Sequence, residues 1–512
     1  MPRTFKNLAA SLLGSGGSAL ISLISIPLII RFVGTEAYGL IGFYATLQGI
    51  FQLLDLGFSP TMSREMARYS VQPEKAHEAR DLVRTLEVVY WVLAIIIGAV
   101  TVAFAPMLAG NWLQTQTIPV SVILQAIVIM GLLSAVQWPI SFYQGGLIGL
   151  QHQVALQIGK TLFSALRNFG GVVVLALVSP TIITFFVWQV VVGAFQLIWL
   201  VWLMWRSMPK AEGHGSPKFR PALLGQVGGF AAGMSGIALF STLLTQLDKV
   251  VLSRLLPLET FGYYIIATNL SGQLLLLAST VFNVAFPQFA ALAIQNDLSA
   301  LRDRYRLITQ IMALLVIPIA CTLIVFSRPI LMAWTHNPAI AESVSPLLIL
   351  LSIGTACNCL MVPAYSLKLA SGFTRVAFAI TATQAILLVP VILLLTNNYG
   401  VTGAASVWVI LNTTYVLIGI PLTHHFVLKG EAGHWFKNAL IIPLGCALAV
   451  VLAFRWVANA LENSTGILAE PYTYLGLIVV VWSIAFLTCM IAMPLTQALM
   501  VQQKRKLIGV LR

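Results

Sequence analysis

Charged residues are scarce in this chain of 512 residues. Only 9% of them are Asp, Glu, Lys or Arg, and 59% are hydrophobic. In soluble domains roughly a quarter of all residues are charged, so a soluble enzyme is excluded. None of the five cysteines has the spacing of a zinc site or of a disulfide framework, and no Walker motif is present. We therefore expect neither a metal or other cofactor nor direct ATP hydrolysis.

Long apolar runs are abundant instead. A helix of about 20 apolar residues crosses the ~30 Å hydrocarbon core of a bilayer, and these runs lack the alternation of a β-barrel. The pattern predicts an all-α polytopic membrane protein with about fourteen transmembrane helices. The expected spans are 8–33, 40–59, 86–108, 118–142, 154–178, 182–205, 223–252, 261–289, 307–332, 346–369, 376–395, 401–426, 439–457 and 475–499.

Basic residues between the spans predict the topology. The net charge is +13, and when the loops are assigned alternately to two sides, 22 of the 29 Lys and Arg, Lys368 among them, fall on one side and 5 on the other. Cytoplasmic loops hold the positive excess, so we expect both termini in the cytoplasm. Topology thus explains the positive charge, and no nucleic-acid partner is expected.

An internal repeat divides the chain. Residues 31–39 (Arg-Phe-Val-Gly-Thr-Glu-Ala-Tyr-Gly) align with residues 254–262 (Arg-Leu-Leu-Pro-Leu-Glu-Thr-Phe-Gly) at an offset of 223, and Tyr143 falls on Tyr365 at 222. Since each copy has six spans, the copies share one topology and are related by a pseudo-twofold axis along the membrane normal. We expect two parallel six-helix lobes, 1–221 with the cytoplasmic linker and 222–430. Residues 431–512 add two C-terminal helices and a basic tail.

A polar stripe follows the fifth expected span. Gln157, Lys160, Ser164, Arg167 and Gly171 recur at spacings of 3 and 4, which places them on one helical face. Ionisable groups at membrane depth normally face a bundle interior or a water-filled cavity. Two cations on one face form a site for an anion, because Arg binds phosphate through two N–H groups and Lys adds a compact charge. The alternative is that the side chains, Lys160 above all, snorkel to the headgroups.

A second polar face follows the second expected span. It carries Tyr44, Gln48, Gln52 and Asp55. Asp55 is a candidate for binding a coupling proton or sodium ion, but a carboxylate in this position could also cap a helix or pair with Arg64.

Asp248 and Lys249 form an adjacent acid and base near the end of the seventh span. Asp248, together with Arg254 and its repeat counterpart Arg31, is a candidate for coupling or gating. A structural ion pair at the outer helix end is the alternative. We expect the cationic site to belong mainly to the first lobe, because the eleventh span has Ala382 and Val389 where the fifth has its two cations.

Three stretches resemble one family of membrane proteins. Residues 34–39 (Gly-Thr-Glu-Ala-Tyr-Gly), residues 53–57 (Leu-Leu-Asp-Leu-Gly) and the segment 246–264 resemble the O-antigen and polysaccharide flippases. These flippases belong to the multidrug/oligosaccharidyl-lipid/polysaccharide exporter superfamily. The expected number of spans, fourteen rather than twelve, is similar to that of the lipid II flippase of peptidoglycan synthesis.

The resemblance implies a function in the bacterial inner membrane. It implies that two lobes arranged in a V move an undecaprenyl-diphosphate-linked O-antigen or exopolysaccharide unit to the outer leaflet by alternating access. It also implies coupling of this movement to an ion gradient. The implied partners are membrane lipids, a polysaccharide polymerase and the chain-length machinery. By the same resemblance, Lys160, Arg167 and Lys249 would meet the diphosphate. The residues that would meet sugar are Gln48, Gln52, Gln157, Tyr44 and Tyr143.

Two other functions were weighed against a flippase. An organic-cation antiporter of the same superfamily needs carboxylates in its cavity, and only Asp55 and Asp248 lie near one. A membrane glycosyltransferase or polymerase needs a sizeable outer loop, and no outer loop here exceeds about a dozen residues. The sequence therefore favours a carrier over an enzyme.

Overall fold

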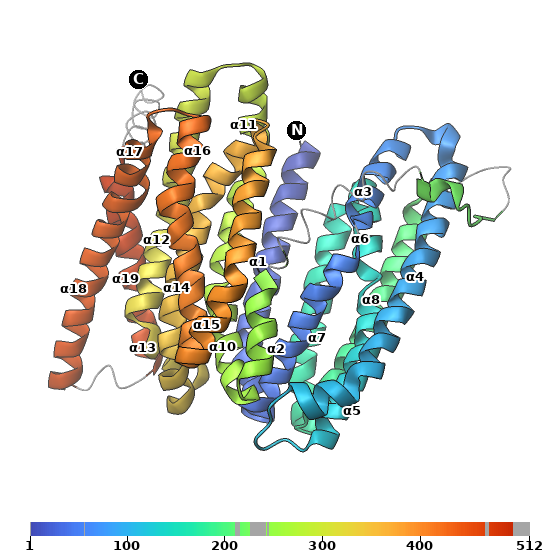
Figure 1. Cartoon of the computed structure of the whole chain (residues 1–512), viewed down its shortest axis with the longest axis horizontal. Coiled ribbons are helices and arrows are strands. Elements are labelled where there is room, and N and C mark those ends of the chain that lie inside the picture. The colour runs from blue at the N-terminus through green and yellow to red at the C-terminus, as the bar shows by residue number, and fades with distance from the viewer. Residues whose placement is uncertain are drawn as a thin grey trace. The chain divides into compact units, whose positions relative to one another are not determined.

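The structure, a computed structural model, is helical throughout the part of the chain that it describes. It describes residues 2–55, 57–209, 216–225, 242, 245–465 and 471–494. In these ranges every regular element is a helix (Figure 1). One isolated parallel bridge joins Gln114 to Pro257. Twelve helical segments there are long and apolar enough to cross a membrane. The predicted all-α membrane fold is thus confirmed.

The helices fall into two sets along the chain. The first set is α1 Pro2–Val33, α2 Thr35–Phe51, α3 Phe58–Tyr69, α4 Ala76–Met107, α5 Val120–Gln137, α6 Ile140–Gly149, α7 Gln153–Leu177 and α8 Ile182–Ser207. The second set is α10 Leu258–Ser271, α11 Leu274–Ile294, α12 Leu298–Val325, α13 Ser327–Thr335, α14 Pro338–Ala370, α15 Thr374–Thr414, α16 Ile420–Phe426, α17 Glu431–Trp435, α18 Ile442–Thr465 and α19 Pro471–Ala492.

The number of spans depends on two of these segments. The segment Ile380–Phe426 holds two predicted spans, and Gly400 between them has a non-helical backbone (φ 60°, ψ −140°). The predicted span 223–252 lies largely outside the described residues. The count of fourteen and the arrangement of the two lobes stay predictions.

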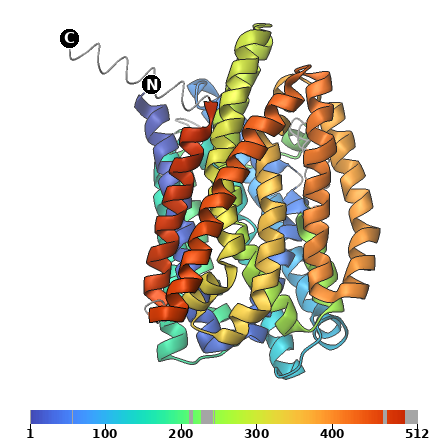
Figure 2. The ribbon, with the colours of Figure 1, turned by 90° about the vertical axis from the view of Figure 1, so that its left-hand side faces the viewer.

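Contacts divide the chain into two compact units, Met1–Gly262 and Tyr263–Arg512. The first unit has a core of α3, α4, α6 and α8 side chains around Tyr90 and Phe142. In the second unit one continuous core joins α11, α12 and α14 to α18 and α19, through residues such as Val451 and Val481. Figure 2 shows α18 and α19, in red, running beside α12. The last two helices are thus packed into the second unit.

The second predicted span is interrupted near its end. After α2 a short 3-10 turn, Gln52–Asp55, leads to Gly57, whose φ of 71° is the left-handed conformation that glycine adopts without strain. The chain then continues as α3, which packs closely on α6. A Cβ atom on Gly145 would lie 2.5 Å from the Ser59 carbonyl oxygen, and one on Gly149 would lie 2.3 Å from that of Ser63. This small-residue contact fixes the break beside Asp55.

Candidate functional site

Helix α7 carries the two membrane cations predicted from the sequence. Lys160 and Arg167 are seven residues apart, about 10 Å along an α-helix at ~1.5 Å per residue. Asn168 fixes the helix to α1, because its Oδ1 accepts a hydrogen bond from the Ser25 hydroxyl at 3.1 Å. Ser25 is fully buried, so the face that carries the cations has a fixed orientation relative to α1.

Arg167 has a buried nitrogen without a partner. Its Nη2 donates to Oε1 of Gln196 on α8 at 2.6 Å, and its carbonyl oxygen accepts from Nε2 of Gln189 at 3.1 Å. Its Nε is buried and makes no hydrogen bond to any residue that the structure describes. An unsatisfied N–H on a charged group costs free energy, and an anion placed against it would recover that cost.

Lys160 is the second cation of the face and is half-buried. No hydrogen bond or ion pair joins its ammonium group to another described residue. Gln157, one turn before it, is also half-buried. Neither of the two cations on α7 is therefore neutralised by a carboxylate within the described ranges.

The polar face of α2 meets this site through Tyr44. Arg167 interacts electrostatically with the Tyr44 hydroxyl, which accepts a hydrogen bond from Gln48 Nε2 at 2.7 Å. The same amide also donates to the Ser134 hydroxyl of α5 at 3.2 Å. Gln52 lies farther along and is exposed. The structure thus brings Tyr44, Gln48 and Arg167 together.

Asp55 lies at the break between α2 and α3. Its Oδ1 accepts a hydrogen bond from the Tyr90 hydroxyl, and its Oδ2 accepts one from the Ser59 backbone N–H at 3.2 Å. Arg64 pairs instead with Glu65 at 3.0 Å. The carboxylate therefore caps α3, one of the alternatives open from the sequence.

Tyr143 is placed differently from the expectation. Its side chain is 1% exposed, and its hydroxyl donates to Oε1 of Glu87 at 2.6 Å. Arg84 and Trp205 also donate to this carboxylate, at 2.7 and 3.3 Å. The structure uses Tyr143 in packing and leaves no surface on it for a sugar.

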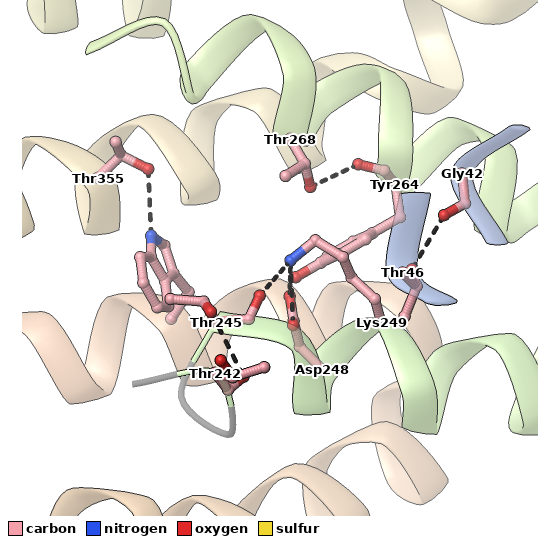
Figure 3. Close-up of polar contacts among 10 residues, drawn as sticks. Gly42, Thr46, Thr242, Thr245, Asp248, Lys249, Tyr264, Thr268 and Thr355 are labelled. Carbon is pink, nitrogen blue, oxygen red and sulfur yellow. Dashed lines mark hydrogen bonds and ion pairs between the residues drawn. The ribbon is translucent and has the colours of Figure 1, made fainter. Parts of the chain in front are cut away.

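Lys249 is neutralised by its neighbour. Its Nζ donates to Asp248 Oδ1 at 3.2 Å and to the Thr245 carbonyl oxygen at 2.6 Å (Figure 3). Both charged side chains are mostly buried. The ion pair is thus present, and by this Lys249 differs from the cations on α7, while a coupling or gating role of Asp248 stays a prediction.

The two arginines that the repeat aligns, Arg31 and Arg254, are both exposed. The Arg254 guanidinium lies 5.9 Å from the centre of the Trp112 ring, and its carbonyl oxygen accepts from Gln114 at 3.0 Å. Arg31 ends α1. Neither arginine joins the site on α7 through a contact in the described part of the chain.

Sequence reasoning missed a buried lysine in the second unit. Lys368 lies inside the predicted span 346–369 but was counted with the loop charges, and in the structure its side chain is 1% exposed. Its Nζ donates to the hydroxyl of Tyr415 at 2.5 Å. The apolar residues on both sides of Lys368 were the signal that it belongs to a helix.

A family model described as polysaccharide biosynthesis protein matches residues 4–293. No curated protein matches the sequence. Within the described residues, no group of three His, Cys, Asp or Glu could hold a metal ion.

Solved structures with a similar fold include flippases and transporters. The lipid II flippase MurJ in an inward closed conformation has a TM-score of 0.68 and 13% identity, covering 93% of this chain and 97% of that chain. An inward-facing multidrug resistance MATE family transporter of the MOP superfamily has a TM-score of 0.64 and 12% identity, covering 82% and 96%. A mutant of the Vibrio cholerae MATE transporter VcmN has a TM-score of 0.57 and 15% identity, covering 81% and 95%. At these identities the likeness shows the fold.

Proposed function

Since the chain belongs to the polysaccharide biosynthesis protein family, we propose that it is a flippase for a lipid-linked oligosaccharide. The proposed substrate is an undecaprenyl-diphosphate-linked unit of O-antigen or exopolysaccharide. It moves from the cytoplasmic to the outer leaflet of a bacterial inner membrane by alternating access. The family resemblance expected from the sequence is confirmed by the match.

The observation that carries this proposal is the pair of cations on α7. The Arg167 Nε and the Lys160 ammonium lack partners in the described ranges, and both belong to a membrane-spanning helix. A diphosphate offers several acceptor oxygens and two or more negative charges, which match a guanidinium and an ammonium on one helical face. We therefore assign Arg167 and Lys160 to the diphosphate.

Neutral polar side chains beside these cations are assigned to the glycan. Tyr44 and Gln48 lie with Arg167, and Gln157 precedes Lys160 on α7. Amide and hydroxyl groups both donate and accept hydrogen bonds, as recognition of sugar hydroxyls requires. Gln52 extends this set toward the break in α2.

Coupling to an ion gradient is assigned to Asp55. Its half-buried carboxylate lies at an interrupted transmembrane helix, and it makes no ion pair with a described residue. Interrupted helices commonly form the ion sites of secondary transporters. Delivery of the substrate to a polymerase and to chain-length machinery would follow from the family's role in polysaccharide synthesis.

An organic-cation antiporter is the runner-up because MATE transporters share the fold. Two cations without carboxylate partners on α7 disfavour a cationic substrate, since like charges repel in a low-dielectric site. The relatives' names describe flippases and transporters, in agreement with a carrier rather than an enzyme.

Translocation in proteoliposomes tests the proposal. Vesicles would contain a polyprenyl-diphosphate oligosaccharide or, in parallel, the same oligosaccharide on a polyprenyl monophosphate. We expect translocation of the diphosphate form by the wild-type protein and its loss in Arg167→Gln. Arg206→Gln, which removes an exposed cation of α8, is the matched control and should retain activity. Equal rates for Arg167→Gln and the control would contradict the proposal.

A further inference from the structure

The connection between α4 and α5 lies against the beginning of the second repeat. Gln114 Nε2 donates to the Arg254 carbonyl oxygen at 3.0 Å, and the Gln114 carbonyl oxygen accepts from the Leu258 N–H at 2.8 Å. Gln114 and Pro257 form the isolated parallel bridge. These contacts hold Gln114, and with it the connection 113–117, against residues 254–258, at the end expected to face outward.

One carboxylate holds the other side of this connection. Glu36, at the start of α2, accepts hydrogen bonds from the backbone N–H groups of Gln116 at 2.6 Å and Thr117 at 3.0 Å. The Thr117 hydroxyl donates to the same carboxylate. Glu36 is 8% exposed and has no basic partner in the ranges that the structure describes. Its charge is therefore balanced only by these donors.

A reciprocal contact of two glycines lies beside the connection. A Cβ atom on Gly39 would lie 2.3 Å from the Leu258 carbonyl oxygen, and one on Gly262 would lie 2.5 Å from that of Thr35. The repeat offset of 223 relates Thr35 to Leu258 and Gly39 to Gly262. Equivalent residues therefore exchange the same contact, as a twofold relation of the two copies requires. Only glycine permits this approach of two backbones.

We propose that Glu36 is a gating residue that holds residues 113–117 as a clasp across the start of α2 and residues 254–258. The inference rests on the proposed function, because an alternating-access carrier must open each end in turn. The clasp joins the two copies of the repeat where their backbones already touch. Opening this end separates the two backbones at the glycine contact. The clasp must therefore detach either from Glu36 at the start of α2 or from residues 254–258. The Glu36 side depends on a single carboxylate, whereas the Gln114 side has backbone and side-chain bonds. Release at Glu36 is therefore the smaller change.

A cross-link across the Gln114 side tests which side of the clasp opens. Cysteines at Gln114 and Pro257, which are bridge partners, would be oxidised to a disulfide in the full chain, and its five native cysteines are buried or half-buried. Because the clasp is released at Glu36, we expect the polyprenyl-diphosphate oligosaccharide to be translocated at the reduced rate after complete cross-linking, as in either single-cysteine variant. Loss of translocation on oxidation and its return with a reductant would show that the Gln114 side must open, and would overturn the inference.

Thiol labelling tests the role of Glu36 without any substrate. A cysteine at Gln114 would react with a membrane-impermeant maleimide about tenfold faster in Glu36→Gln, because an amide cannot accept the three hydrogen bonds of the carboxylate. Thr117→Val, which removes one donor, should give a smaller increase. Glu74→Gln, at an exposed acid near α4, is the matched control and should change nothing. Unchanged labelling in Glu36→Gln would overturn the clasp. Failure of the wild-type protein to translocate would contradict only the proposed function.

Discussion

The cations of α12 and those of α7 are in opposite electrostatic situations. Arg306 binds Glu431 through two parallel bonds, Nε to Oε2 at 2.8 Å and Nη2 to Oε1 at 2.7 Å. Arg302 pairs with the same carboxylate at 3.0 Å, and the Glu431 side chain is only 4% exposed. Lys160 and Arg167 on α7 have no acid of their own within the described chain.

The difference separates cations that stabilise the fold by pairing with a carboxylate from cations that are left to bind an anion. The Glu431 cluster fastens α17, and with it α18 and α19, to α12. Arg220 bonded to Asp81 at 2.8 Å, and Lys249 bonded to Asp248, also belong to this neutralised class. Lys160 and Arg167 have no such acid in the described ranges, and we attribute this to an anionic substrate. Lys368 also lacks an acid partner there, but its ammonium group is bonded to the hydroxyl of Tyr415.

Arg167→Gln is expected to have the largest effect on transport. The substitution removes the guanidinium whose Nε lacks a partner in the described ranges. Losing charged hydrogen bonds to the substrate, worth ~2–3 kcal/mol, lowers translocation about 100-fold. Because the deleted charge lacks an acid partner, the thermal midpoint should not fall. Proteoliposome translocation and thermal unfolding of the same preparation check both statements. A fall in stability together with activity would place Arg167 in the neutralised class.

Glu431→Gln should have the converse effect. Loss of the carboxylate leaves two arginines facing each other, and we expect a loss of about 2 kcal/mol of stability, reduced because both arginines are partly exposed. Thermal unfolding measures the change, and Glu342→Gln, an exposed acid on α14, is the control. Unchanged stability of Glu431→Gln would contradict the claim that Arg302 and Arg306 stabilise the fold through this carboxylate.

Lys160→Gln sharpens the comparison within α7. The side chain is half-buried and only about 10 Å from Arg167, so we expect about a tenfold loss of translocation, less than for Arg167. Lys160→Arg keeps the charge and should restore most of the rate. If Arg and Gln at this position behaved alike, charge at Lys160 would be irrelevant to transport.

Lys249→Gln is expected to change transport least, by less than about threefold, since its charge is already paired with Asp248. Translocation relative to the wild type in the same vesicles measures it. A loss as large as that of Arg167→Gln would return Lys249 to the substrate site.

The fold and the stripe on α7 followed from the sequence because both depend on local spacing. Apolar run length predicted the helices, and intervals of 3 and 4 placed Lys160 and Arg167 on one face. The repeat offset also related the glycines that meet in the structure.

The pairing of charges could not be predicted, because it depends on contacts between distant segments. Glu431 is 125 residues from Arg306, and Glu87 is 56 residues from Tyr143. No periodicity relates such partners. The expectation that Tyr143 meets sugar arose from that gap. The burial of Lys368 likewise depends on a distant partner, since Tyr415 is 47 residues away.

Mass spectrometry of the lipids that co-purify with the protein tests the central claim most directly. The account predicts a polyprenyl-diphosphate glycan with the wild-type protein and with Arg206→Gln, and its loss from the Lys160→Gln, Arg167→Gln double variant. Recovery of the glycan from the double variant at the wild-type level would contradict the account. Bulk phospholipid alone in every preparation would contradict it as well.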